Sequence, residues 1–148
     1  MSFQKALLTK KDVKNFYKSE YYGNKYVELH KEWFPIKSST ILSGIVSDIM
    51  CDGHLQEKLW RIDYCSKNKS ELHRFRKIIF NSFGLKGKIR KCSTNKFGKT
   101  YLFGVNNKLF SRILYLIGTP SGSKVNKRYF IPNWIVEDKE CFRVFVRR

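Results

Sequence analysis

Hydrophobic and polar positions recur with two periods along this 148-residue chain, and the periods predict where helices and strands lie. Apolar residues at helical spacing fill 40–51, 72–83 and 107–117, and glycine follows each stretch. Ser38 or Ser39 can cap the first of these helices, and Asn68 with Glu71 fits a capping box before the second. Period-two alternation marks 59–65, with 54–56 as a short hairpin partner, and a second hairpin flanks 95–98. The order αββαββα predicts an α+β fold, an antiparallel sheet with helices on one face.

An N-terminal helical segment precedes this pattern. Residues 8–34 read as two short helices around Tyr22-Gly23-Asn24, with Thr9 capping the first and Pro35 ending the second. A helix-turn-helix and a helical brace packed on the main domain both fit this pattern. We therefore expect a helical segment over 1–38, the main domain over 39–136 and a short terminal helix within 137–148.

The helix expected over 40–51 carries a stripe of small residues. Ser43, Ser47 and Cys51 recur at every fourth position, with Gly44 beside them. Small side chains let two helix backbones approach closely. Apolar residues flank the stripe, and a helix that is apolar on more than one side is buried on more than one side. We expect it to pack on its own domain and on a partner helix at once.

The charge balance points to a polyanionic partner. Thirty Lys and Arg stand against twelve Asp and Glu, a formal net charge of +18. Such a field attracts nucleic acid, whereas the basic residues are too dispersed for a membrane-binding cluster. Four cysteines without paired spacing indicate reduced thiols and an intracellular, cytoplasmic and nucleoid-associated protein. The 42% hydrophobic content supports a packed core.

Polar and basic residues lie on or between the predicted strands, where they can track phosphates and reach base edges. Exposed lysines that discourage strand pairing are the alternative explanation. The candidates for DNA binding, including three residues nearer the C-terminus, are His54, Gln56, Lys58, Arg61, Lys88, Arg90, Lys96, Lys99, Lys124, Lys127 and Arg128.

The C-terminal end of the 40–51 helix offers chemistry. Asp52 follows it, where the helix dipole disfavours a carboxylate by a few tenths to ~1 kcal/mol. A bound Mg²⁺ would reverse that preference, since Mg²⁺ favours one or two carboxylates completed by phosphate oxygens and water. The alternative is an ordinary helix stop with Gly53 in the left-handed conformation. Asp48, one turn earlier, either supports Asp52 or faces a cation in the core.

The run IVSDIMCDG at 45–53, followed by His54-Leu55, resembles the LAGLIDADG motif of homing endonucleases. The stretches SKNKSELHRFRKIIFNSFGLKGKIRK and LFSRILYLIGTPSGSKVNKRYFIPNWI are similar to the elements that follow the motif in that family, so the resemblance covers 39–135. It implies a saddle-shaped sheet on double-stranded DNA and a phosphodiesterase that depends on Mg²⁺ or another divalent cation. Asp48 and Met50 depart from an aliphatic and a commonly acidic position of the motif.

By this resemblance, Asp52 is the catalytic acid that binds the metal. Lys67 and Lys108 are candidate basic catalytic residues, and Asn68 and Asp48 are candidates for supporting the site without touching the metal. Ordinary solvated polar residues are the alternative for Lys67, Asn68 and Lys108.

The family contains one-motif homodimers and two-motif monomers. The stretch ECFRVFVRR at 140–148 resembles the opening of a second motif helix. The partner implied for Ser43, Gly44, Ser47 and Cys51 is thus a second copy of the chain or a second repeat. The function implied is sequence-specific cleavage of duplex DNA. The alternative is a non-catalytic DNA-binding regulator, or a maturase that binds intron RNA.

Overall fold

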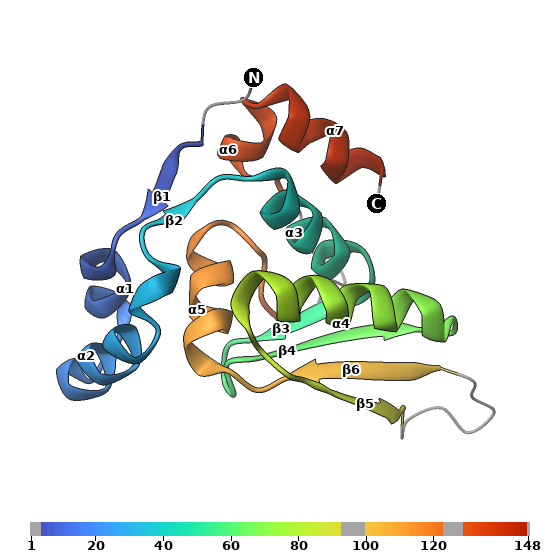
Figure 1. The fold of residues 1–148 in the computed structure, drawn as a ribbon, viewed down its shortest axis with the longest axis horizontal. Coiled ribbons are helices and arrows are strands. Elements are labelled where there is room, and N and C mark those ends of the chain that lie inside the picture. Colours follow the sequence, from blue (N-terminus) through green and yellow to red (C-terminus); the bar gives the residue numbers. More distant parts are fainter. Residues whose placement is uncertain (1–3, 93–99, 123–128, 148) are drawn as a thin grey trace.

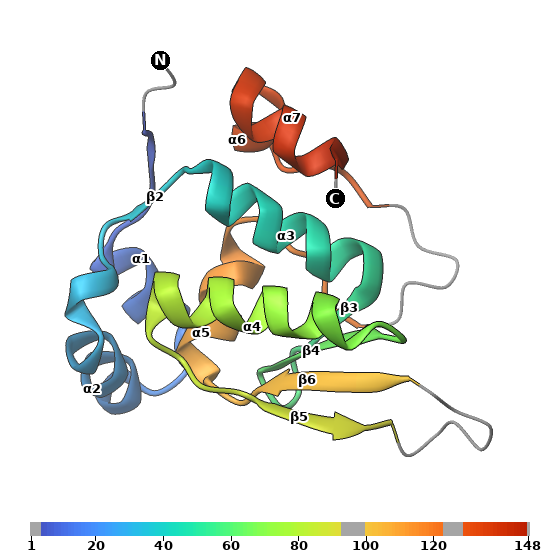
Figure 2. The ribbon, with the colours of Figure 1, turned by 45° about the vertical axis from the view of Figure 1, so that its right-hand side comes forward.

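The computed structural model describes residues 4–92, 100–122 and 129–147, arranged as Figures 1 and 2 show. Its central domain consists of α3 (Thr40–Asp52), β3 (Gly53–Gln56), β4 (Arg61–Ser66), α4 (Lys69–Phe83), β5 (Lys88–Lys91), β6 (Tyr101–Val105) and α5 (Lys108–Leu116). This is the αββαββα order that the periodicity predicts. The α+β class is confirmed.

The strands of this domain form one antiparallel four-stranded sheet in the order β3-β4-β6-β5. Helices α3, α4 and α5 lie on the same side of it (Figures 1 and 2). Aromatic stacking joins α4 to the middle of the sheet, since the Phe75 ring lies 4.5 Å from that of Tyr64 and 5.8 Å from that of Phe103. Phe75 and Phe103 are fully buried, so the core lies between the sheet and the helices.

Helix caps follow the sequence closely. The side chains of Ser39, Asn68 and Asn107 accept hydrogen bonds from backbone N–H groups in the first turns of α3, α4 and α5. Gly84 ends α4 in the left-handed conformation, with φ 69°. The capping box expected between Asn68 and Glu71 is absent, because the Glu71 carboxylate accepts from Arg74 at 3.0 Å instead.

The N-terminal segment contains β1 (Ala6–Leu8), α1 (Lys10–Phe16), α2 (Glu20–Leu29), the 3-10 helix η1 (Lys31–Trp33) and β2 (Ile36–Lys37). Its turn was predicted in the wrong place, because Tyr22-Gly23-Asn24 lies inside α2. The break falls between α1 and α2, where Ser19 caps α2. A Cβ on Gly23 would lie 3.1 Å from Lys14 O, so glycine lets α1 and α2 pack closely.

This segment also contacts the central domain. Trp33 Nε1 donates to Phe83 O at 3.2 Å, and the ring of Phe16 meets that of Trp60 at 5.5 Å. These contacts support the brace interpretation, and DNA binding by a helix-turn-helix stays a prediction. Strands β1 and β2 pair with each other, and they are too short to leave a period-two pattern in the sequence.

The chain ends with α6 (Asn133–Val136) and α7 (Lys139–Arg147). Helix α7 is the terminal helix expected within 137–148, and it packs along α3 (Figure 1). Trp134 anchors α6, since its Nε1 donates to the buried oxygen of Ile117, the residue that caps the end of α5, at 2.8 Å.

Candidate nucleic-acid interface and active site

The end of α3 passes into β3 without a loop. Gly53 is both the helix cap and the first strand residue, with φ −112° and ψ −177°. The left-handed conformation considered for Gly53 is therefore wrong. Glycine is required here for space, because a Cβ would lie 2.7 Å from Ile49 Cα and 2.9 Å from Asp63 O. This close approach fixes the last residue of α3 against the end of the sheet.

Asp52 is that last residue, and it is exposed. Its carboxylate forms no hydrogen bond or ion pair with any residue that the structure describes, and the last turn of α3 contains no basic residue. The helix dipole thus acts on this carboxylate without a compensating charge on its own helix. The position suits a carboxylate whose positively charged partner comes from outside the described residues.

Asp48, one turn earlier, has the opposite surroundings. It is 4% exposed, and its two carboxylate oxygens accept from the two terminal nitrogens of Arg74 at 3.1 Å each. Arg74 also pairs with Glu71 at 2.9 Å and donates to the Tyr64 hydroxyl at 3.3 Å. Asp48 was expected either to support Asp52 or to face a cation in the core. The structure shows the second arrangement, with Arg74 as the cation.

The charges around this pair shift the pKa values of two partners. Partial burial alone lowers the pKa of Arg74, but its hydrogen bonds and charge interactions with Asp48 and Glu71 outweigh burial and raise that pKa above its usual range. Burial raises the pKa of Tyr64, and the charges of Asp48 and Asp52 raise it further while Arg74 opposes them. The charge of Asp52 is therefore among those that act on the Tyr64 hydroxyl.

A divalent cation fits only part of this arrangement. Among residues 4–92, 100–122 and 129–147, no three His, Cys, Asp or Glu side chains come together as a metal site. Asp48 and Glu71 are both occupied by Arg74. Asp52 can supply one carboxylate ligand, and phosphate oxygens, water and a second carboxylate would have to complete the site.

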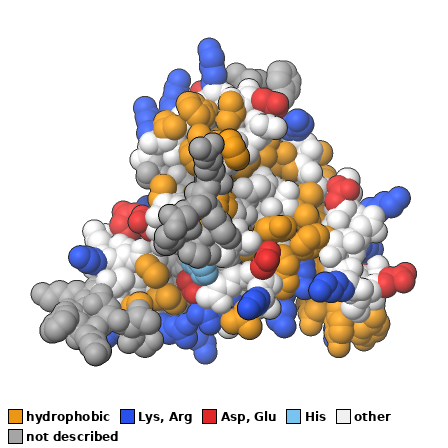
Figure 3. All heavy atoms as spheres, turned by 180° about the vertical axis from the view of Figure 1, so that it is seen from behind, with side chains coloured by type: hydrophobic (Ala, Val, Ile, Leu, Met, Phe, Trp, Pro, Cys, Tyr) orange, Lys and Arg blue, Asp and Glu red, His pale blue; other side chains and the backbone are white. Residues whose placement is uncertain are grey.

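One face of the sheet is free of the helices, and strand register shows which residues share it. Leu55, Ile62 and Val105 are paired across β3, β4 and β6 and point into the core. The alternate positions therefore point the other way. Five predicted DNA contacts fall on this open face: His54, Gln56, Arg61, Lys88 and Arg90. Figure 3 shows Lys and Arg side chains along the lower edge of the molecule, where Figure 1 places the sheet.

The cations of the open face differ in availability. Arg61 donates from Nε and a terminal nitrogen to both oxygens of Asp63 at 3.1 Å, so its charge is already paired. Gly104 makes room for that carboxylate, since a Cβ there would lie 3.1 Å from Asp63 Oδ1. Lys88 and Arg90 on β5 are exposed and form no ion pair with a described carboxylate. We expect these two to contact phosphate most directly.

The remaining candidates divide between the two ends of the sheet. Lys67 and Asn68 follow β4 at the end where Asp52 lies, because Gly53 pairs with Tyr64. Asn68 is occupied in capping α4, and its side chain accepts from the Ser70 hydroxyl at 2.6 Å. Lys108 begins α5 at the opposite end, beyond Val105 and its partner Ile62, so it does not join Asp52. Lys96, Lys99, Lys124, Lys127 and Arg128 lie outside the described residues.

The small-residue face of α3 contacts α7 of the same chain. The hydroxyls of Ser43 and Ser47 donate to the backbone oxygens of Cys141 and Phe145, each at 2.7 Å. A four-residue step on α3 thus matches a four-residue step on α7, so the two helices run parallel. Gly44 is buried and Cys51 is exposed. Contact between this face and a second copy stays a prediction, and it would require α7 to move.

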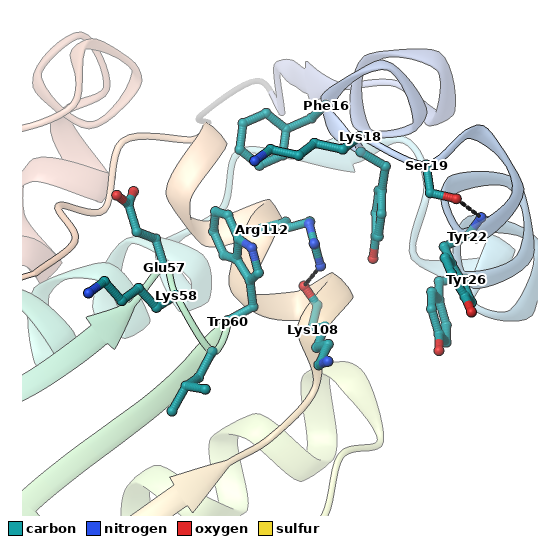
Figure 4. A pocket seen from close by; sticks show the side chains of 12 residues that line it. Phe16, Lys18, Ser19, Tyr22, Tyr26, Glu57, Lys58, Trp60, Lys108 and Arg112 are labelled. Carbon is teal, nitrogen blue, oxygen red and sulfur yellow. Dashed lines mark hydrogen bonds between the residues drawn. The ribbon is translucent and has the colours of Figure 1, made fainter.

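An aromatic pocket at the other end of the sheet was not predicted. It has a volume of about 770 Å³ and lies between the N-terminal helices, the β3–β4 turn and α5 (Figure 4). The Arg112 guanidinium lies 4.0 Å from the ring centre of Tyr17 and 4.8 Å from that of Trp60. Trp60 has φ 48°, a left-handed conformation that costs a non-glycine residue about 1–2 kcal/mol. The sequence signal was the density of aromatic residues in α1 and α2.

Two further expectations can be compared with the structure. All four cysteines are free thiols, as expected from their spacing. Across the described ranges, every helix is too short or too polar to cross a membrane.

Comparison with known proteins gives little to place the chain in a family. No protein-family model matches it. It is similar to the tRNA-splicing ligase RtcB of Pyrococcus furiosus, with 32% identity over 107 residues, which are 65% of this chain and 11% of the ligase. The chain thus spans about a ninth of the length of the curated relative that it matches.

Proposed function

We propose that this chain binds double-stranded DNA across the open face of its sheet and takes part in its hydrolytic cleavage, as a homing endonuclease of the LAGLIDADG type. The observation that carries the proposal is the strand register, which gathers five polar and basic residues on one face with Asp52 at the end of the same sheet. The αββαββα order around an antiparallel sheet supports the same fold assignment.

Different residues have different roles in this proposed function. Lys88 and Arg90 neutralise phosphates along the edge strand β5, while His54 and Gln56 reach toward base edges from β3. Asp52 would hold the divalent cation, which when bound stabilises charge on the attacked phosphate and makes a nucleophile of water. Lys67, at the same end, is placed to approach a neighbouring phosphate.

A second carboxylate is needed to complete the site. Because α7 runs parallel to α3, the C-terminal end of α7 lies toward the Asp52 end of α3. This is where the resemblance places a second motif helix. The second acid would therefore come from a second repeat on that side, or from a second copy that displaces α7.

Cleavage of a randomised duplex library with Mg²⁺ tests the proposal, using a series of protein concentrations. We expect the wild-type chain to cut, and Asp52→Asn to reduce cutting by at least ~100-fold while it keeps DNA binding. Glu137→Gln, an exposed carboxylate change on the α6 side, is the matched control and should cut normally. Normal cutting by Asp52→Asn, or sequence-specific binding without cutting at any concentration, would contradict the nuclease.

RNA is the second candidate ligand. The similar ligase is named for tRNA splicing, but the match covers only 11% of that protein and supports no ligase activity for this chain. An open face that neutralises phosphates serves RNA as well as DNA. Competition between a duplex DNA and a structured intron RNA for the same labelled chain decides which polyanion is preferred.

A further inference from the structure

The pocket between α2, the β3–β4 turn and α5 has the chemistry of a nucleotide site. Aromatic rings from three elements line it. Phe16 of α1 contacts Trp60 of the β3–β4 turn, and Tyr22 and Tyr26 of α2 lie across the pocket from Trp60 (Figure 4). Tyr22 and Tyr26 stack on each other at 6.0 Å, and Tyr22 is 50% exposed. An exposed ring held in place by a second ring is a ready platform for a nucleobase.

Cations surround these rings. Lys18, Lys58, Lys108 and Arg112 line the pocket, against the single carboxylate of Glu57. Arg112 is held between the rings of Tyr17 and Trp60, and one terminal nitrogen donates to Lys108 O at 3.2 Å. The lining thus combines flat apolar surfaces with an excess of positive charge, and this combination matches a base joined to a phosphate.

The position of the pocket relates it to the open face. The β3–β4 turn, 57–60, contributes Lys58 and Trp60 to the pocket and joins the strands that carry Gln56 and Arg61. The backbone of Trp60 is in the left-handed region, so the turn holds this ring at a conformational cost. A strand of nucleic acid that leaves the open face near the turn can therefore place an unpaired base in the pocket.

We infer that this pocket binds an unpaired nucleotide of a single-stranded nucleic acid, with the base on the Tyr22 platform and the phosphates near Lys18, Lys58 and Lys108. Cleavage by way of Asp52 requires neither the pocket nor an unpaired base, so this inference goes beyond the proposed function. It assigns the chain a second contact with nucleic acid, at the opposite end of the sheet from Asp52.

Fluorescence anisotropy of a labelled single-stranded hexanucleotide, measured without divalent cations, tests the inference. We expect Tyr22→Ala to weaken binding about tenfold, the loss typical of one stacked base. Phe130→Ala is the matched control, because Phe130 is an aromatic residue that is 81% exposed and does not line the pocket. It should bind the hexanucleotide like the wild type.

Three results would overturn the inference: equal binding by the Tyr22→Ala and Phe130→Ala variants, no binding by the wild type, or selective binding of a tyrosine-rich peptide in place of the hexanucleotide. If a mononucleotide competes as well as the hexanucleotide, the ligand of the pocket is a free nucleotide and not a nucleotide within a strand. Lys88→Glu should keep hexanucleotide binding but weaken duplex binding. Duplex binding at the open face and hexanucleotide binding at the pocket are therefore tested separately.

Discussion

Two aspartates on successive turns of α3 show how differently one helix can use the same side chain. Asp48 is buried and held by Arg74 through two hydrogen bonds of 3.1 Å, whereas Asp52 is exposed and unpaired among the described residues. Charge alone does not separate them. The difference lies in the neighbours, since Arg74 of α4 pairs with Asp48, whereas no cation of the described residues pairs with Asp52. A buried carboxylate is tied to stability, and an open one is available for chemistry.

The largest stability effect is expected at Asp48. Asp48→Ala should cost about 3 kcal/mol of unfolding free energy, because the partly desolvated Arg74 guanidinium loses its buried partner and keeps only the more exposed Glu71. Asp52→Ala should change the unfolding free energy by less than about 0.5 kcal/mol. Urea denaturation of both variants measures the contrast.

A double variant separates charge from packing at this site. Asp48→Leu combined with Arg74→Met should recover most of the loss, since an apolar pair of similar volume often replaces a buried ion pair without cost. Equal stability of the Asp48→Ala and Asp52→Ala proteins would remove the distinction between the two aspartates.

The second effect concerns the junction that positions Asp52. Gly53→Ala forces a Cβ to within 2.7 Å of Ile49 Cα and should cost about 2 kcal/mol, because backbone must move. Gly84 is the matched control, since it has open space but a φ of 69°. Asparagine tolerates the left-handed conformation, so Gly84→Asn should be mild and Gly53→Asn severe in the same denaturation experiment. A mild Gly53→Asn would show that the junction has room.

The smallest effect is a pH dependence at Tyr64. Burial and the charge of Asp48 raise its pKa above the ordinary value of 10.0, so the folded state holds this proton more tightly than the unfolded state. The stability contributed is fully present below pH 10.0 and is lost as pH rises through the folded pKa. Tyr64→Phe should therefore lose less stability than the wild type between about pH 9 and 11. Identical pH profiles would contradict this assignment.

The sequence predicted much of the central domain because its elements have strong periods and clear caps. Helix α3 was expected over 40–51 and runs over Thr40–Asp52, and Asn68 and Gly84 lie at the ends of α4 where their chemistry placed them. The position of the helix ends in turn located Asp52. Its exposure followed only from the structure.

What the sequence could not give depends on contacts between distant segments. The partner of Asp48 lies 26 positions away on α4, and the partners of Ser43 and Ser47 lie 98 positions away on α7. Gly53 has ordinary strand angles, so only its neighbours reveal why glycine is there. The aromatic pocket likewise needs three elements to meet before Trp60 and Arg112 become a site.

The most direct test of the account is duplex DNA binding after charge reversal on two sides of the molecule. Lys88→Glu with Arg90→Glu changes the open face, and Arg76→Glu with Lys77→Glu makes the same charge change on exposed positions of α4. We predict that the first pair weakens binding on the order of tenfold or more and lowers its salt dependence, because phosphate contacts are lost, while the second has a much smaller effect. Equal weakening by both pairs would contradict binding across the open face of the sheet.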